Sequence, residues 1–411
     1  MKRPHKAWLV CLGCALLFFC TSGLSVNAFT VYQPYILAQN GFTNAQSSSI
    51  ITVRSLFGLL GMLCTGRYYH RFSLRWGVAL AGAFTVLGFA LFGLAGSLAA
   101  YYGAAAVMGL GYGFGTMIPI SIILEHWFWK KRTLAIGICS AFTGLSTFGL
   151  PSLLTWLILT FGLSAAFFVE AAFAAALVLC SVLLIHGSPE ERDTWQPYGF
   201  GEEQDASSTK GGQVHLKPSE WPVLWAMLLC LGGLTSVGYS HLTVHLNSTG
   251  FDPHVTALAI TASGLAMTFG KFAFGWLSDQ LPVLRKNRLF AGFLLLGLAL
   301  LCLVRRSVPL LFLAVCAYGF GLAFTTVGIT EWAGDLSTAK EYETVVRRFQ
   351  LGYAAGGFVF SSLPGVLADR FGASYVPAYL FFILCAVFVT ATVQWFYRHR
   401  VFQTAKKEPI P

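Results

Sequence analysis

Two cationic side chains stand inside long apolar stretches of the sequence. Arg54 falls within residues 45–66, and Lys271 falls within residues 254–278. A cation in an apolar interior is costly, so it usually faces a cavity or a charged partner. A central cavity with these two cations suits an anion, including one with two carboxylates. We therefore expect Arg54 and Lys271 to bind a small organic anion.

The two cations are expected at different depths, and Arg54 has a competing interpretation. Arg54 precedes His70 by 16 residues, whereas Lys271 precedes Asp279 by 8 residues. At a helical rise of about 1.5 Å per residue, these offsets stagger the two cations by about 12 Å. Glu170 is expected at a depth similar to that of Arg54. The sequence therefore leaves open whether Arg54 binds a ligand or forms an ion pair with Glu170.

Weaker candidates supply hydroxyl and imidazole groups. A tyrosine hydroxyl can donate to a carboxylate while its ring excludes water. Four tyrosines in separate apolar stretches could line the cavity: Tyr32, Tyr112, Tyr318 and Tyr353. His241 and His245 lie four residues apart, on one face of a helix, and could form a polar mouth or a pH-sensing gate. A metal site needs further ligands, so we expect no metal or other cofactor.

The composition indicates which kind of molecule must position these residues. Of the 411 residues, 56% are hydrophobic and 11% are charged, whereas soluble globular proteins carry about 25% charged residues. This excludes a soluble enzyme, a disordered chain and a secreted disulfide scaffold. Spanning about 30 Å of hydrocarbon takes about 20 apolar residues in a helix. Twelve such runs cover residues 8–34, 45–66, 74–97, 99–124, 133–160, 163–185, 220–245, 254–278, 289–304, 308–334, 349–368 and 374–397.

A polar segment divides the runs into six and six. Residues 187–219 are rich in charged residues, Gly and Ser, which is typical of a flexible linker. We expect an N-terminal bundle over residues 1–186, a linker over 187–219, a C-terminal bundle over 220–398 and a tail over 399–411. Of the 27 Lys and Arg residues, 22 then fall on the side of the termini and the linker, and 3 fall on the other side. This asymmetry predicts cytoplasmic termini, and it explains the net charge of +10 without nucleic-acid binding.

Four loop sequences between the runs carry signatures. The loop after the eighth run reads GWLSD and ends at Asp279, and its counterpart over residues 66–75 has His70 at the position of that aspartate. Residues 127–137 read WFWKKRTLAIG, and residues 365–375 read GVLADRFGASY. Over essentially its whole length, the chain resembles the major facilitator superfamily. The last two signatures resemble the branch of oxalate/formate antiporters and monocarboxylate transporters.

The resemblance implies an all-α membrane protein with twelve transmembrane helices in two six-helix bundles. It also implies a role for Lys271, because this branch places a cation at the same step of helix eight, where it binds the substrate carboxylate. The mammalian-type pattern has an aspartate four residues before that cation, and here Met267 stands in its place. The resemblance therefore implies carboxylate binding but not proton coupling through such a pair.

The loop signatures also imply gating contacts. Gly66 and Gly275 are expected to permit close approach of helices. Asp279 is expected to act as a latch that holds one conformation shut, through hydrogen bonds or an ion pair. In the N-terminal half, His70 and Arg71 would form the matching latch, and His70 would make it depend on pH. Glu170 and the two histidines of helix seven are the remaining candidates for gating or coupling.

These expectations define one leading function and one alternative. The sequence lacks the HExxH, Walker A and GxSxG motifs, so we expect no enzyme and no ATP hydrolysis. The leading function is secondary transport of a monocarboxylate or short dicarboxylate by alternating access, as proton symport or anion exchange, by a monomer in a bacterial inner membrane. The alternative is a multidrug-type exporter of hydrophobic or cationic compounds with the same fold, which would use a membrane acid such as Glu170.

Overall fold

In the computed structural model, every named secondary-structure element of the described residues is a helix. The described residues are 5–129, 131–147, 150–189, 196–199, 216–278, 280–305, 307–338 and 341–401. Among them, 12 helical segments are long and apolar enough to cross a membrane, from Lys6–Asn40 to Val376–His399. This confirms the twelve-helix, all-α architecture. The chain forms two compact units, residues 1–208 and residues 209–411.

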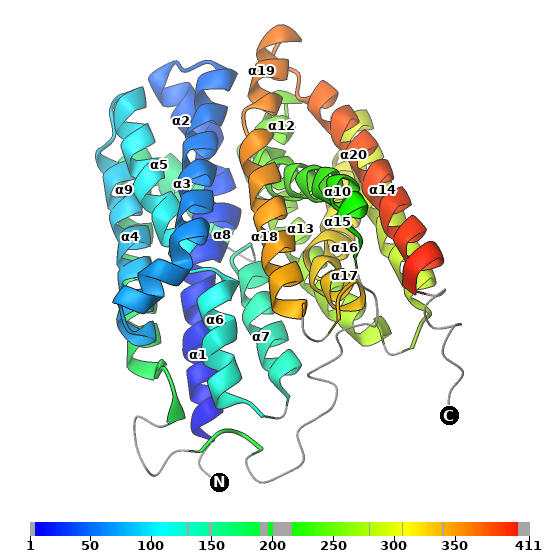
Figure 1. The fold of residues 1–411 in the computed structure, drawn as a ribbon. Coiled ribbons are helices and arrows are strands. Elements are labelled where there is room, and N and C mark those ends of the chain that lie inside the picture. Colours follow the sequence, from blue (N-terminus) through cyan, green and yellow to red (C-terminus); the bar gives the residue numbers. More distant parts are fainter. Residues whose placement is uncertain are drawn as a thin grey trace. The chain divides into compact units, whose positions relative to one another are not determined.

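The first unit contains six membrane-spanning segments, of which three are continuous and three are divided (Figure 1). The continuous second, third and sixth segments are α3 (Asn44–Arg71), α4 (Leu74–Leu94) and α9 (Leu163–Leu184). The first segment consists of α1 (Lys6–Phe18), the π-helix η1 (Phe19–Asn27), the 3-10 helix η2 (Ala28–Val31) and α2 (Tyr32–Asn40). The fourth is divided into α5 (Leu98–Phe114) and α6 (Met117–Trp127), and the fifth into α7 (Arg132–Leu145) and α8 (Leu150–Phe161).

The second unit repeats this pattern. Its continuous second, third and sixth segments are α13 (Pro253–Ser278), α14 (Val283–Leu303) and α20 (Val376–Phe396), which ends in η7 (Tyr397–Val401). Its first segment consists of η5 (Pro218–Glu220), α10 (Trp221–Gly232), the π-helix η6 (Gly233–Val237), α11 (Gly238–Ser240) and α12 (Leu242–Ser248). Its fourth is divided into α15 (Val308–Gly321), α16 (Ala323–Thr326) and α17 (Gly328–Asp335), and its fifth into α18 (Tyr342–Val359) and α19 (Leu363–Arg370).

Hydroxyl side chains accompany the π-helix of the first segment. In η1, the Ser25 hydroxyl donates to the Thr21 carbonyl, and the Thr21 hydroxyl contacts the Leu17 carbonyl at 3.1 Å and the Gly115 carbonyl at 2.7 Å. Such bonds from Ser and Thr to the backbone bend helices. The bond to Gly115 joins the irregular part of the first segment to the break in the fourth.

Proline marks the breaks in the fifth segment of each unit. The helices α8 and α19 both have proline as their second residue, Pro151 and Pro364. Proline lacks an N–H, which the first turn of a helix does not need, but it cannot continue a preceding helix. The same residue therefore starts the second half of this segment in both units.

Glycines allow the closest helix contacts, but not at the positions expected from the loop signatures. Between α3 and α5, a Cβ added at Gly61 would lie 3.0 Å from the Gly113 Cα, and the two helices therefore touch through their backbones. A Cβ added at Gly66 or Gly275 would meet nothing within 4 Å in the described structure. The expectation that these two loop glycines permit close helix approach was wrong.

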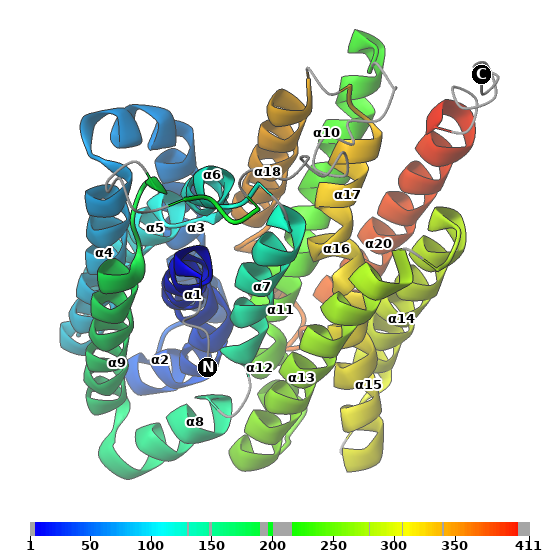
Figure 2. The ribbon, with the colours of Figure 1, turned by 90° about the horizontal axis from the view of Figure 1, so that it is seen from below.

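Each unit has its own apolar interior, and apolar side chains also cover much of its outside. Figure 2 shows α1 between α7 and α9 in the first unit, and α14 between α15 and α20 in the second. Exposed apolar side chains include Phe272, Leu94 and Trp76, which are 76%, 73% and 69% exposed. Exposed apolar surface on this scale is typical of a lipid-facing protein.

Part of the expected linker lies against the first unit. Residues 196–199 are described, and Tyr198 forms an isolated β-bridge with Phe128. The Tyr198 N–H donates to the Trp127 carbonyl at 2.8 Å, and its ring lies 5.5 Å from that of Trp8. The linker is therefore anchored at Tyr198 to the loop that follows α6.

The contact between α3 and α5 can be tested by a single methyl group. We expect Gly109→Ala to lower the melting temperature in detergent, at a cost of about 1–3 kcal/mol. The new methyl group would press on the Arg54 carbonyl and lie 3.0 Å from the Phe57 Cβ. Gly103→Ala in the same helix is the matched control, because a Cβ there meets nothing within 4 Å and alanine favours the helix. Equal melting temperatures of the two variants would contradict this packing.

Candidate functional site

Arg54 docks on the irregular backbone of the first segment. Its side chain on α3 is 3% exposed, and its Nη1 donates to the Ser25 carbonyl at 2.6 Å. Its guanidinium carbon lies 5.2 Å from the ring centroid of Phe29. A guanidinium has five N–H donors in a planar fork, and one of them has a hydrogen-bond partner among the described residues. Arg54 therefore keeps the capacity to bind an anion.

Tyr112 lies beside Arg54, as a shared anion site would require. Tyr112 on α5 is half-buried and lies near Arg54. Its ring packs on Gly58, where an added Cβ would lie 2.9 Å from the Tyr112 Cδ1. The missing side chain at Gly58, one turn after Arg54, therefore makes room for this tyrosine.

Glu170 does not form the ion pair that the sequence left open. Its side chain on α9 is 3% exposed, and among the described residues neither of its carboxylate oxygens has a hydrogen-bond partner. Tyr32, predicted to line a cavity, is fully buried beside it. The Tyr32 ring stacks on Phe167 at 4.0 Å, and its hydroxyl donates to the Ala166 carbonyl at 3.3 Å. Tyr32 is therefore a packing residue in this conformation.

Lys271 lies on α13 and is half-buried. The neighbouring Gly270 faces α15, where an added Cβ would lie 2.6 Å from the Phe320 carbonyl oxygen. This contact presses the turn that carries Lys271 against the fourth segment of the second unit. Met267, one turn earlier, is 4% exposed and belongs to the apolar core. The aspartate of the family pattern is thus replaced by a packing residue.

Tyrosines of the second unit gather around its π-helix. Tyr318 is fully buried, and its hydroxyl donates to the Leu234 carbonyl of η6 at 3.0 Å. Tyr239 and Tyr353 lie in the vicinity of Tyr318. Tyr318 therefore satisfies a carbonyl of the irregular backbone, and the half-buried Tyr353 lies in the same polar group.

His241 and His245 are not at an exposed mouth. Both are fully buried, which does not fit a polar mouth, and a gating role for them stays a prediction. The His241 Nδ1 is bonded to the Val237 carbonyl at 3.0 Å, and the His245 Nε2 is bonded to the Leu301 carbonyl of α14 at 2.9 Å. The His245 imidazole therefore connects this segment to α14, whereas the His241 imidazole bonds to the backbone of its own segment.

The expected latch residues are placed only in part. His70 and Arg71 are exposed at the end of α3, and Asp279 lies outside the described residues. A gating role for these three residues stays a prediction.

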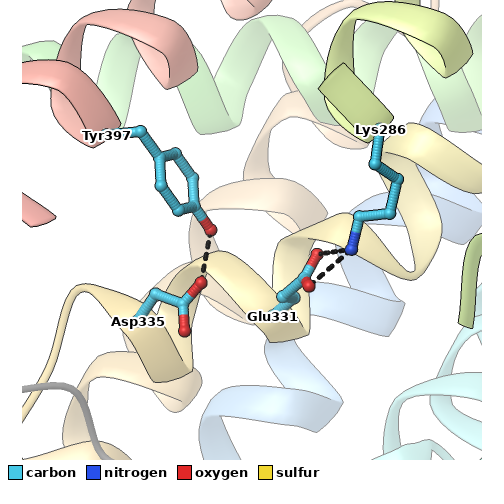
Figure 3. A network of polar contacts seen from close by, with 4 residues as sticks. All are labelled: Lys286, Glu331, Asp335 and Tyr397. Carbon is cyan, nitrogen blue, oxygen red and sulfur yellow. Dashed lines mark hydrogen bonds and ion pairs between the residues drawn. The ribbon is translucent and has the colours of Figure 1, made fainter. Parts of the chain in front are cut away.

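Figure 3 shows a charged network that sequence reasoning missed. The Lys286 Nζ lies 2.5 and 2.8 Å from the two carboxylate oxygens of Glu331 and 4.3 Å from the Phe274 ring centroid. One helical turn after Glu331, Asp335 accepts a 2.6 Å hydrogen bond from the Tyr397 hydroxyl. Lys286, which precedes the apolar run 289–304, and the two acids are absent from the site residues that the sequence predicts. The sequence feature that could have revealed this network is Glu331, because an acid within an apolar run needs a partner.

Comparisons with known proteins identify the family. The sequence matches the Major Facilitator Superfamily over residues 14–252 and 241–411. The chain belongs to this superfamily. As a major facilitator protein it is a multi-pass membrane transporter and not an enzyme.

Curated relatives of this major facilitator protein include monocarboxylate transporters of animals. Monocarboxylate transporter 13 of Rattus norvegicus is 28% identical over 342 residues, which are 81% of this chain and 76% of that protein. Monocarboxylate transporter 12 of Homo sapiens is 25% identical over 408 residues, which are 91% of this chain and 77% of that protein. These relatives are eukaryotic and give no support to the bacterial inner membrane expected from the sequence.

Solved structures of distant members share the fold. The nucleoside transporter NupG is 13% identical, with a TM-score of 0.71 over 97% of this chain and 100% of that one. A bacterial homologue of the human lysosomal transporter Spinster is 15% identical, with a TM-score of 0.70 over 97% of this chain and 99% of that one.

The ion pair of Figure 3 makes an asymmetric prediction about stability. The Lys286 side chain is 0% exposed, and that of Glu331 is 23% exposed. Glu331→Gln leaves a buried ammonium without its carboxylate, at a cost of about 3–5 kcal/mol. Lys286→Met leaves a carboxylate that water partly reaches, so its cost should be smaller.

Melting temperatures in detergent check this order. Glu331→Gln should melt lowest, Lys286→Met should lie between it and the wild type, and Lys286→Met combined with Glu331→Leu should recover part of the loss. If Glu331→Gln melts like the wild type, the pair does not stabilise the protein.

Proposed function

We propose that this major facilitator protein carries a small organic anion, a monocarboxylate or a short dicarboxylate, by alternating access. One observation carries the proposal: each half of the chain has a cation inside a membrane-spanning helix, Arg54 on α3 and Lys271 on α13. The relatives named as monocarboxylate transporters agree with this substrate class.

The two cations suit different parts of anion binding. The guanidinium of Arg54 has donors to spare, and its planar fork can hold a carboxylate through two parallel hydrogen bonds. Lys271 supplies a compact charge without such directionality. Tyr112 would add a hydroxyl donor, whereas the hydroxyls of Tyr32 and Tyr318 already donate to backbone carbonyls. Tyr353 stays a predicted cavity residue.

Charge neutralisation gives a reason for the conformational change. An uncompensated cation disfavours any state that encloses it in low dielectric, and a bound anion removes that cost. A ligand shifts a conformational equilibrium only by its difference in affinity for the two states. The anion would therefore favour the closed intermediate in which the two bundles exchange access. We further propose that both termini are cytoplasmic and that the protein acts as a monomer.

Removal of either cation tests the proposed function. Uptake of radiolabelled pyruvate and of oxalate into proteoliposomes should fall at least about tenfold in Lys271→Met and in Arg54→Met, because a hydrogen bond to a charged group contributes about 1.5–3 kcal/mol. The matched control is Arg288→Met, which removes an exposed positive charge from α14. Wild-type melting temperatures would show that the variants fold. Wild-type uptake by Lys271→Met would refute its assignment as a substrate ligand.

Glu170 favours a second candidate function, export of hydrophobic or cationic compounds. Its carboxylate is buried and has no hydrogen-bond donor within the described residues, and a buried acid can bind a cationic compound. Efflux of tetraphenylphosphonium that is lost in Glu170→Gln and kept in Lys271→Met would establish the exporter and exclude the anion carrier.

A further inference from the structure

Glu170 is placed where an ionised carboxylate is costly. It is the eighth residue of α9 and is 3% exposed, and among the described residues neither carboxyl oxygen has a hydrogen-bond partner, although the Tyr32 hydroxyl lies beside it. Moving a carboxylate out of water costs several kcal/mol unless a cation or several donors compensate it. A proton on the carboxyl removes most of that cost. The surroundings of Glu170 therefore fit the neutral acid.

Arg54, in the same unit, carries a permanent positive charge that its surroundings compensate only in part. Its guanidinium stays charged because it cannot be deprotonated in a protein. The Ser25 carbonyl and the face of the Phe29 ring compensate that charge, but a carbonyl dipole and a ring quadrupole do so only in part. Any anion that reaches Arg54 would therefore be held strongly.

The acid and the cation border one aromatic cluster. Phe29, which lies under Arg54, is 5.9 Å from the ring of Tyr32 and 6.3 Å from that of Phe167. Tyr32 stacks on Phe167 and interacts with the Glu170 carboxyl. Phe29 thus joins the surroundings of the two groups, and an apolar environment strengthens the attraction between opposite charges that approach each other in it.

The other ionisable groups that face Glu170 or Arg54 are weak acids. Tyr32 faces Glu170 from α2, Cys20 faces it from η1, and Tyr112 faces Arg54 from α5. The helix α8, which also packs on α9, has no ionisable side chain in its sequence. The remaining packed elements carry these further ionisable side chains: Lys6, Cys11, Cys14, Tyr35, Arg75, Tyr101 and Tyr102. Arg75 donates to the Val182 carbonyl, three turns beyond Glu170 on α9.

We propose that Glu170 binds the coupled proton and that its carboxylate competes with the transported anion for Arg54. In one state the carboxyl keeps its proton, and Arg54 is available to the anion. When the proton leaves to water, the carboxyl becomes a carboxylate. Arg54 then exchanges the Ser25 carbonyl for this carboxylate, and the anion loses its partner.

This competition links the proton to the anion. Protonation of Glu170 favours anion binding at Arg54, and by reciprocity a bound anion favours protonation. The protein would therefore move both together, which is symport rather than exchange. The inference rests on the proposed function for the identity of the anion, whereas the proton site can be tested without any substrate.

Infrared spectroscopy of the purified protein tests the proton site directly. We expect the carbonyl band of a protonated carboxyl to disappear as the pH is raised between about pH 5 and pH 9 and to be absent from Glu170→Gln. In Arg54→Met the band should persist to higher pH, because the carboxylate has lost its cation. Glu125→Gln, which removes an exposed acid at the end of α6, is the matched control and should keep the band. The proposal would be overturned if the band disappeared at the same pH in Arg54→Met as in the wild type. It would also be overturned if Glu170→Gln removed no band.

Transport of pyruvate in proteoliposomes tests the coupling. An inward proton gradient should stimulate wild-type uptake by about fivefold or more, and this factor should fall to about one in Glu170→Gln. Counterflow of labelled against unlabelled pyruvate should persist in that variant, because Arg54 stays available to the anion. Loss of counterflow with a normal melting temperature would mean that Glu170 is not a proton site alone, and it would contradict the proposal.

The two experiments separate failure of the inference from failure of the proposed function. If wild-type protein shows no counterflow with pyruvate, lactate, formate or oxalate, the carboxylate-carrier function fails, and the infrared titration still decides whether Glu170 and Arg54 share a proton-dependent interaction. If counterflow is normal and Glu170→Gln keeps its response to the proton gradient, the carrier stands and the inference is wrong.

Discussion

The rest of the structure depends on the cost of a positive charge in an apolar interior. Lipid and packed apolar side chains offer no water, so a buried cation needs an anion, a carbonyl dipole or an aromatic face. Lys286 has a full counter-charge in Glu331, with both oxygens within 2.8 Å. Arg54 has only the Ser25 carbonyl and an aromatic ring among its described contacts. Lys286 is neutralised within the protein, whereas in our proposal Arg54 is left for the transported anion.

Irregular backbone makes this division possible. A continuous helix satisfies its own carbonyls, whereas the π-helices η1 and η6 turn carbonyls toward side chains of other segments. In η1 the Ser25 carbonyl accepts from Arg54, and in η6 the Leu234 carbonyl accepts from Tyr318. Interrupted segments at matching positions of two repeats mark the binding region in many transporters. Here the first, fourth and fifth segments of each unit are divided, while the second, third and sixth are continuous.

The sequence predicts the helices well and the polar partners poorly, for a physical reason. Apolar runs fix the number of spans, because each must cover the hydrocarbon layer. Polar partners depend on how each helix is rotated and on what covers it. The i, i+4 spacing places His241 and His245 on one face, but it does not reveal that both are buried. Similar depth suggested an Arg54–Glu170 pair that the described contacts lack. The burial of Lys286 is not evident from the sequence, because this residue stands at the edge of an apolar run.

The presence of a methionine at position 267 explains why Glu170 matters for the proposed proton coupling. In the branch that the chain resembles, an aspartate one turn before the helix-eight cation can take part in proton coupling, and here a buried methionine fills that position. If such a carrier still uses a proton gradient, the proton needs another carboxyl within the membrane-spanning part. Glu170 is buried there without a counter-charge in the described structure, in the same unit as an incompletely compensated guanidinium. The proton-binding acid would then lie in the first unit, at Glu170, and not in the second unit at position 267. The mechanism would be the same, because one cation would bind an internal carboxylate and a transported carboxylate alternately.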